Sequence, residues 1–179
     1  MKRILVVLAL IATLSSATFA QGLGFHGVAA QAGLVLPMET NWTAGLALGA
    51  KVNMGQVADN LTLLPIIQYH MPGFDVPAGA GDATVSVFVI GADVHYAIND
   101  QFYAGGGLNY NSITLEYKWD VPFFGTTTID GSTSEIGFSA LGGYNLNLAG
   151  YPAAIEARYN IVSNYNSLVA TLNVFFGSK

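Results

Sequence analysis

Six charged or titratable side chains of this chain are of the types that enzymes use for acid–base chemistry. Carboxylates, histidine and arginine act as general acids, general bases and charge stabilisers when they converge on a reacting group. The same residue types also pair with one another wherever a fold buries them, because an isolated buried charge is costly. The candidates are Lys51, Asp93, His95, Glu135, Glu156 and Arg158. The elements that carry these residues decide between the two roles.

Signatures of cofactor and metal binding are absent from the sequence. It contains no glycine-rich phosphate loop and no pair of histidines at metal-binding spacing. Because it also lacks cysteine, thiolate metal sites, disulfides and a lipid-anchored lipoprotein are excluded. We therefore expect no catalytic residues, no cofactor and no metal.

The segment from Trp42 to Met54 indicates what kind of element carries the candidates. Its even positions are apolar and its odd positions are small or polar, with Lys51 on the polar side. Successive side chains of a β-strand point to opposite faces, so this alternation predicts a strand with one apolar face. The same pattern recurs along the chain.

Eight such segments are expected, at about ten residues each plus turns. They cover residues 24–36, 42–54, 61–71, 83–98, 102–119, 135–148, 155–161 and 168–176. Two irregularities are predicted. Pro65 has no N–H to donate to a neighbouring strand, which implies a bulge or a locally unpaired edge. The apolar parity changes between Val89 and Ile90, which predicts a bulge near Val89.

The beginning of the chain has the features of an export signal. A basic start is followed by an apolar run over residues 4–14, and Thr18-Phe19-Ala20 supplies small side chains for cleavage after Ala20. The apolar run is too short to span a bilayer. We expect a signal peptide over residues 1–20 and one barrel domain over residues 21–179.

The composition indicates a surface that borders lipid. Charged residues make up 9% of the chain, against roughly 25% in ordinary soluble domains. Removing Lys2 and Arg3 with the signal leaves 4 basic and 11 acidic residues, a net charge of 4 − 11 = −7, which argues against nucleic acid as a partner. No apolar run after the signal is long enough for a spanning helix. The predicted fold is all-β, an eight-stranded antiparallel up-and-down transmembrane β-barrel.

The cost of charge at the lipid face predicts what fills the barrel. Because Lys or Arg near mid-membrane costs roughly 2–4 kcal/mol there, Lys51 and Arg158 should face inward. Counted from the nearest periplasmic turns, Asp93 and Glu156 lie at similar heights, so one interior salt-bridge cluster is expected, joined by His95. An eight-stranded barrel is just wide enough to be filled by its own side chains. We therefore expect a plugged lumen.

Aromatic residues gather near the predicted strand ends, as in the interfacial girdles of membrane barrels. Those toward the periplasm are Tyr96, Phe102, Tyr103, Tyr144, Tyr151 and Phe176, and those toward the outside are Trp42, Tyr117 and Trp119. The longest external loop is expected over residues 119–133. Its apolar tip offers a contact surface made of Trp119, Val121, Phe123 and Phe124. Alternatively, continued alternation through Trp119 extends the hairpin and offers an edge for strand addition.

The export signal, the eight alternating segments and the closing Phe175-Phe176 strand resemble the small outer-membrane β-barrels of the OmpA/OmpX type. The resemblance implies a bacterial outer-membrane location, lipid as a partner, recognition of the terminal aromatic by the barrel-assembly machinery, and a monomer. One departure is that Gly177-Ser178-Lys179 follows the terminal aromatic residue.

Three classes of function follow from these expectations. The first is a structural or adhesin-like barrel that meets a surface or protein ligand through its external loops and is not an enzyme. The second is a narrow channel or a conduit for hydrophobic solutes. The third is a lipid-modifying enzyme, although His26, His70 and His95 lack the His-x-Ser arrangement of lipid A deacylases.

Overall fold

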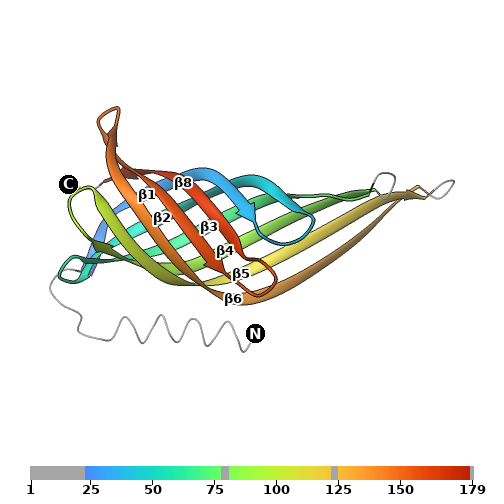
Figure 1. Cartoon of the computed structure of the whole chain (residues 1–179), viewed down its shortest axis with the longest axis horizontal. Coiled ribbons are helices and arrows are strands. Elements are labelled where there is room, and N and C mark those ends of the chain that lie inside the picture. Colours follow the sequence, from blue (N-terminus) through green and yellow to red (C-terminus); the bar gives the residue numbers. More distant parts are fainter. Residues whose placement is uncertain (1–22, 78–80, 122–124, 178–179) are drawn as a thin grey trace.

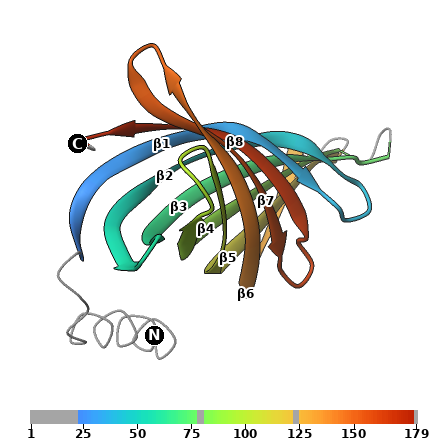
Figure 2. The same ribbon diagram turned by 60° about the vertical axis from the view of Figure 1, so that its left-hand side comes forward.

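The computed structural model describes residues 23–77, 81–121 and 125–177, which form eight antiparallel strands closed into a barrel. Each strand pairs with the next and β8 returns to β1, as Figures 1 and 2 show. The strands are β1 (Leu23–Pro37), β2 (Trp42–Ala58), β3 (Leu61–Phe74), β4 (Asp82–Ala97), β5 (Phe102–Val121), β6 (Gly125–Leu148), β7 (Tyr151–Ile161) and β8 (Ser167–Phe176). The predicted fold class is therefore confirmed.

The predicted signal peptide and its cleavage site after Ala20 lie outside the described residues, so they stay predictions. Within the part of the chain that the structure describes, no helix is long and apolar enough to cross a membrane. We call the end of the barrel that holds Leu23 and Phe176 the periplasmic end, after the orientation that the sequence predicts, and the opposite end the outer end.

Asparagine side chains and backbones shape several of the tight turns. Asn41, Asn60 and Asn164 have positive φ angles of 67°, 60° and 64°, a conformation that asparagine tolerates better than most residues. In the turn before β5, the Asn99 side chain accepts hydrogen bonds from the backbone N–H groups of Gln101 and Phe102 at 2.9 and 2.8 Å. Such turns let consecutive strands pair directly.

The irregularity expected at Pro65 is present. The β2–β3 register shifts between the Lys51↔Ile66 pair and the Gln56↔Thr62 pair. Four residues of β2, 52–55, there lie opposite three of β3, 63–65, so β2 carries the extra residue. On its other side Pro65 pairs in continuous register with Ala92 of β4.

The bulge expected near Val89 is absent, and that prediction is wrong. Strand β4 pairs in unbroken register with β5 from Asp82 to Ala97. Val85, Val87 and Val89 are all buried inside the barrel, whereas Phe88 and Ile90 face outward. The apolar residues of β4 change from inward-facing to outward-facing positions along the strand, because the interior is apolar near its start and polar near its end. The backbone stays regular throughout.

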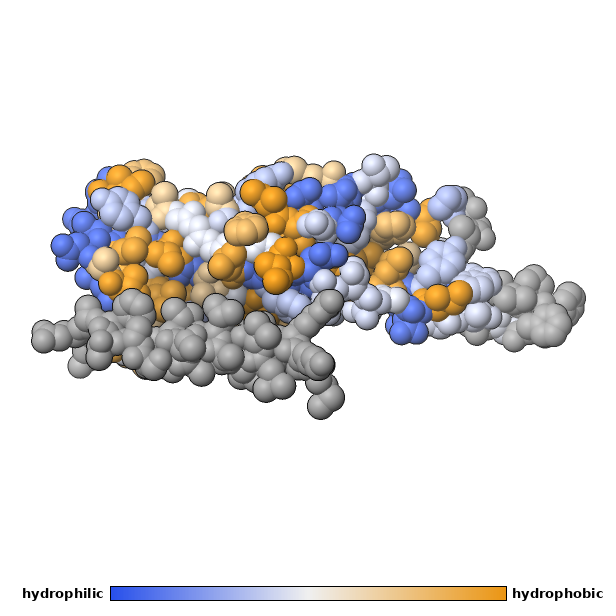
Figure 3. Space-filling view, turned by 90° about the horizontal axis from the view of Figure 1, so that it is seen from below, coloured by the Kyte–Doolittle hydropathy of each residue, from blue (hydrophilic) through white to orange (hydrophobic). Residues whose placement is uncertain are grey.

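The outward face changes polarity at one level of the barrel. Ile90, Tyr110 and Ile136 pair in one row across β4, β5 and β6, and all three are exposed. The next row outward is Phe88↔Ser112↔Ser134, and the rows beyond it carry Ser86, Thr114 and Ser132 and then Thr84, Glu116 and Asp130. An apolar band thus ends where a polar surface begins, and Figure 3 shows apolar side chains gathered over the body of the barrel.

Three strands continue beyond this level. The β3–β4 ladder ends at His70↔Val87 and the β6–β7 ladder ends at Phe138↔Ile161. Residues 82–86 of β4, 114–121 of β5 and 125–132 of β6 project as a three-stranded sheet, which we call the extension (Figure 1). The segment expected as a long loop over residues 119–133 is therefore mostly strand, and the alternative of an extended hairpin is confirmed.

Candidate functional site

Four charged side chains meet in the lumen near the periplasmic end. Lys51 Nζ lies 2.5 Å from Glu156 Oε2 and 3.6 Å from Asp93 Oδ2. The guanidinium of Arg158 donates two bonds to the Asp93 carboxylate, with Nη1–Oδ1 at 2.9 Å and a second bond from Nη2 to Oδ2. Each of these side chains is 1% exposed. Two cations and two anions thus neutralise one another out of contact with water.

Strand alternation explains how the residues of this charged cluster meet. Glu156 and Arg158 are two positions apart on β7, as are Asp93 and His95 on β4, so each pair faces the same side of its strand. Gly107 of β5 pairs with Asp93, and a Cβ at Gly107 would collide with the Asp93 carboxylate. The glycine therefore gives the carboxylate room to reach Arg158.

His95 joins the cluster as predicted. Its Nε2 lies 4.0 Å from Asp93 Oδ2 and 3.8 Å from Glu156 Oε2. Its ring stacks on that of Tyr103, with centroids 4.5 Å apart and an interplanar angle of 12°. The Tyr103 hydroxyl in turn donates to Glu156 Oε2 at 2.9 Å.

Glu135, the sixth candidate, is placed elsewhere by the structure. It pairs with Asn111 on β5 and comes four residues before Ser139 on β6, and Ser139 accepts a hydrogen bond from Arg158. Four residues of strand span about 13 Å. Glu135 therefore lies too far toward the outer end to contact the cluster.

Sequence reasoning missed the inward position of Tyr103, which was expected in the periplasmic aromatic girdle. Phe102 is 48% exposed, whereas Tyr103 is 8% exposed and faces the lumen. The sequence itself could have shown this, because Phe102 and Tyr103 are neighbours on one strand and must therefore face opposite sides of it. The other five girdle residues, Tyr96, Phe102, Tyr144, Tyr151 and Phe176, are exposed as expected.

Amide side chains fill the lumen beyond the charged cluster. Gln31 Nε2 donates to Asn173 Oδ1 at 2.5 Å, and Gln68 Nε2 donates to Gln31 Oε1 at 3.2 Å. Asn173 Nδ2 continues this network to the backbone carbonyl of Ala154 at 3.3 Å. All three amides are at most 3% exposed, so this level is occupied by protein.

The outer half of the lumen is apolar. This differs from the expectation that the inward-facing side chains of each strand are polar. The buried members of the outer half are Val35, Ala47, Val85, Val87, Val89, Ile113, Val162, Tyr165 and Val169. Val162 and Tyr165 belong to the turn between β7 and β8, so this turn folds into the mouth of the barrel. The lumen is closed by an apolar core at the outer end and by paired charges near the periplasmic end.

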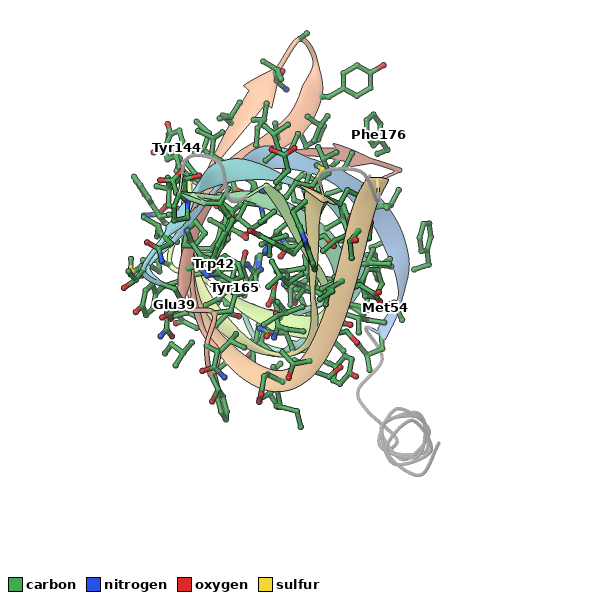
Figure 4. All side chains as sticks on the ribbon, turned by 90° about the vertical axis from the view of Figure 1, so that its right-hand side faces the viewer. Glu39, Trp42, Met54, Tyr144, Tyr165 and Phe176 are labelled. Atoms are coloured by element: carbon green, nitrogen blue, oxygen red, sulfur yellow. The ribbon has the colours of Figure 1, made fainter. Side chains whose placement is uncertain are left out.

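Trp42 belongs to this outer core, and its expected place in the outward-facing girdle is wrong. Its ring centroid lies 5.3 Å from that of Tyr165 and 6.1 Å from that of Phe74. Figure 4 places Trp42 and Tyr165 together within the ring of strands and Phe176 outside it. Between Thr43↔Gly73 and Leu46↔Met71 the register shifts by one residue on β2, and such a bulge reverses the face on which later side chains lie.

The turn that closes the mouth is tied to the turn between β1 and β2. Met38 N–H donates to the Asn166 carbonyl at 2.9 Å, and Asn166 N and Nδ2 donate to Glu39 Oε1 at 3.3 and 3.4 Å. The Tyr165 hydroxyl lies 3.0 Å from His70 Nδ1. Burial raises the pKa of this hydroxyl above its ordinary value. The β1–β2 turn and the β7–β8 turn are thus hydrogen-bonded to each other over the lumen, an arrangement that we call the clasp.

The extension carries a second candidate site on the face continuous with the inside of the barrel. Ala83, Tyr117 and Ile129 pair in one row of this face, and Tyr117 packs on Trp119 with ring centroids 5.5 Å apart. Ile129 is 59% exposed. Of the predicted contact residues, Trp119 lies on this face, Val121 ends β5, and Phe123 and Phe124 lie outside the described residues.

The two candidate sites differ in what they can do chemically. The charged cluster has no exposed carboxylate or cation, so its groups are committed to one another. Among the described residues no group of three or more His, Asp or Glu side chains is arranged to hold a metal ion. The extension, in contrast, offers exposed apolar side chains and suits binding.

No protein-family model and no curated protein matches the sequence. Solved structures do match the fold. The attachment invasion locus protein Ail of Yersinia pestis matches with a TM-score of 0.56 and 13% sequence identity, and the match covers 84% of this chain and 99% of Ail. The structure of Ail in complex with the heparin analogue sucrose octasulfate matches with a TM-score of 0.56, 14% sequence identity and the same coverage. Neisserial surface protein A matches with a TM-score of 0.53 and 15% sequence identity, and the match covers 86% of this chain and 99% of that protein. The chain has the fold of the small eight-stranded outer-membrane β-barrels of the OmpA/OmpX type.

Proposed function

We propose that the protein is an integral outer-membrane barrel with a closed lumen that contacts a surface or protein ligand through its extension. The observation that carries this proposal is the inversion of polarity along β4, β5 and β6. Below the inversion the apolar residues face outward, and above it they face the continuation of the lumen wall. The lower part therefore suits lipid and the upper part suits a macromolecular partner.

The dimensions of the apolar band support the membrane location. On β5 it runs from Phe102 to Tyr110, and on the adjoining β6 from Ile136 to Tyr144. Eight residues of strand span about 26 Å along the strand, or about 20 Å of height at the usual tilt of about 35–45°, which covers most of an apolar band of about 25 Å. A monomer with this much contiguous exposed apolar surface would aggregate in water.

The extension has two features that favour a polypeptide ligand. Its inner face presents Leu115, Tyr117 and Ile129, and Leu115 and Ile129 are more than one-third exposed. Its β6 edge continues past the end of β7, because the β6–β7 ladder stops at Phe138↔Ile161. An unpaired strand edge beside apolar side chains is the arrangement to which extended peptides add as a further strand.

The charge of the extension disfavours a sulfated saccharide. Lys118 is its single basic residue in the sequence, and Glu116 holds it at 2.5 Å. Asp82, Asp120 and Asp130 add further negative charge. Ail has been solved with the heparin analogue sucrose octasulfate, but a polyanion would be repelled by this surface. We therefore favour a protein ligand that binds through apolar contact and backbone pairing.

A paired substitution tests the proposed function. Cells that display the protein are allowed to adhere to surfaces coated with serum proteins or with heparin. Tyr117→Ser with Ile129→Ser should reduce adhesion to the protein surface, because it removes the apolar row. The matched control, Glu116→Ser with Asp130→Ser, changes the adjoining row of the opposite face. Phe123→Ala with Phe124→Ala probes the tip. Unchanged adhesion in the Tyr117/Ile129 variant, with the barrel still folded, would contradict the proposal.

The other two classes of function have less support. A channel requires an open lumen, and the charged cluster and the outer core both occupy it. A lipid-modifying enzyme requires a histidine that lipid can reach, but His70 and His95 face the interior, which leaves His26. Planar-bilayer conductance tests the channel, and analysis of the lipids of expressing cells tests the enzyme.

The resemblance to small outer-membrane barrels also bears on how the protein reaches the membrane. We propose export with cleavage after Ala20, insertion by the barrel-assembly machinery, and a monomeric state in the bacterial outer membrane. Mass measurement of the mature protein tests the cleavage site. Depletion of the assembly machinery should reduce the amount of folded protein.

A further inference from the structure

An open groove of about 520 Å³ lies on the outer wall of the barrel, close to the periplasmic end. Its apolar lining includes Ile98, Phe102, Tyr144, Ile155 and Ala157. None of these residues takes part in the extension or in the charged cluster. The groove is therefore a feature that the proposed function does not use.

A row of small residues explains why the wall is hollow here. Ala104, Gly142, Ala157 and Ala170 pair in one continuous row across β5, β6, β7 and β8. The outward-facing row on the periplasmic side is Phe102, Tyr144, Ile155 and Leu172, in the same order of strands. On β5 and β6 the next row toward the outer end, Gly106 and Ala140, is also small. The small side chains leave a trough, and the Phe102 and Tyr144 rings, 5.0 Å apart, form its periplasmic rim.

The floor of the groove is held from inside the barrel. Tyr103 lines the groove, and a Cβ at the neighbouring Gly143 would collide with its ring. The hydroxyl of Tyr103 is fixed by Glu156 at 2.9 Å and its ring by stacking on His95. A site whose floor is fixed in this way is pre-formed for a ligand.

The position of the groove identifies the chemistry of its occupant. It opens on the apolar band at the level of the periplasmic aromatic rim, where the acyl chains of the inner leaflet begin. Its polar end is the turn before β5, where Asn99 lines the groove and Asp100 is exposed. Among the described residues, the basic side chains nearest this end are Lys51 and Arg158, both buried and paired. A carboxylate without an exposed basic neighbour favours an ammonium headgroup over an anionic one.

We propose that the groove binds an acyl chain of a phospholipid with an ammonium headgroup, of the phosphatidylethanolamine class, whose ammonium pairs with Asp100. This inference rests on the proposed membrane location. A second copy of the chain is the competing occupant.

Lipid retention by the purified protein tests the proposal. The mature protein is refolded in detergent and mixed with equal amounts of phosphatidylethanolamine and phosphatidylglycerol that have the same chains, and its bound lipid is then read by native mass spectrometry. The wild type should retain one phosphatidylethanolamine with a preference of about fivefold over phosphatidylglycerol. Asp100→Asn should retain lipid but lose the preference, since it removes the carboxylate and leaves the trough.

Filling the trough should abolish retention. Ala157→Phe places a ring in the groove, and Gly142→Leu is a second such variant, because a Cβ at Gly142 meets its nearest atom, the Tyr103 carbonyl oxygen, at an ordinary 3.7 Å. Ala30→Phe is the matched control, since Ala30 is also an exposed strand alanine but lies on β1, away from the groove. Retention that survives both filling variants, a wild type without lipid preference, or a dimer that Ala157→Phe converts to a monomer would overturn the inference. A protein that stays monodisperse without detergent would instead overturn the proposed function.

Discussion

Lys51 and Glu156 lie 105 positions apart in the sequence, yet their side chains meet at 2.5 Å in the interior of the barrel. Asp93 and Arg158 form the second pair beside them. The cluster holds as many positive as negative charges, so no net charge is buried. Its stability depends on each member, because a buried charge that loses its partner cannot recover its hydration.

Removing one member should therefore cost far more than removing a pair. We expect Glu156→Gln and Lys51→Met each to lower the free energy of unfolding by about 3–5 kcal/mol, because each leaves an unmatched charge. The double variant keeps the Arg158–Asp93 pair and restores neutrality, so its loss should be smaller than the sum of the two. Urea unfolding of the protein refolded in lipid vesicles measures all three. Additive losses would show that the two residues are not coupled.

The charged cluster was largely predictable from the sequence. Lipid excludes Lys51 and Arg158 from the outer face, and the distance of each residue from its turn gives its height. Glu135 was placed in the cluster because of its charge and its inward-facing position in the alternation of β6. Its height in the barrel was not known, because β6 is 24 residues long. Height depends on where the neighbouring strands end, and those ends are properties of the pairing.

The outer half of the barrel was harder to predict. Val85, Val87 and Val89 lie at the alternate positions that face the lumen. Because a polar interior was expected, these apolar residues were assigned to the lipid face, and this required a bulge near Val89. Trp42 has the parity of the lipid face, and the actual bulge, near Ala44 and Gly45, turns it inward. A bulge depends on how two strands match each other, so the alternation of one strand does not reveal it.

The inward position of Trp42 leads to a prediction about tryptophan fluorescence. The chain has two tryptophans, Trp42 in the closed mouth and Trp119 in the extension. Neither should be strongly quenched by lipids brominated near the middle of the acyl chains. A Leu108→Trp variant in which Trp42 and Trp119 are replaced by phenylalanine should be strongly quenched, because Leu108 is 57% exposed on the apolar band. Strong quenching of Trp42 alone would place it on the lipid face.

The level at which polarity inverts should also be measurable as a difference in stability. Leu108 and Thr114 are on the same strand and share the outward parity, but they lie on opposite sides of the inversion. Leu108→Arg should destabilise the barrel in vesicles by about 2–4 kcal/mol, since the charge enters the hydrocarbon. Thr114→Arg should change stability by no more than about 0.5 kcal/mol, as for ordinary surface substitutions. Equal losses at the two positions would mean that the membrane boundary lies elsewhere.

The Tyr165 hydroxyl should make the closure of the outer end sensitive to alkaline pH. Burial raises its pKa in the folded protein, whereas in the unfolded chain the pKa is about 10. Below about pH 10 both states are protonated and the hydroxyl contributes its full stability. Above that pH the unfolded chain releases a proton that the folded protein retains, so stability falls by up to about 1.4 kcal/mol per pH unit.

Tyr165→Phe removes this titration and supplies the comparison. The stability difference between wild type and variant, from urea unfolding, should be constant up to about pH 10 and then shift against the wild type. The clasp between Asn166 and Glu39 carries no phenol, so a variant there, Glu39→Gln, should keep the alkaline slope of the wild type. A difference between wild type and Tyr165→Phe that stays constant to about pH 12 would mean that the hydroxyl already reaches water, and that the mouth is open around it.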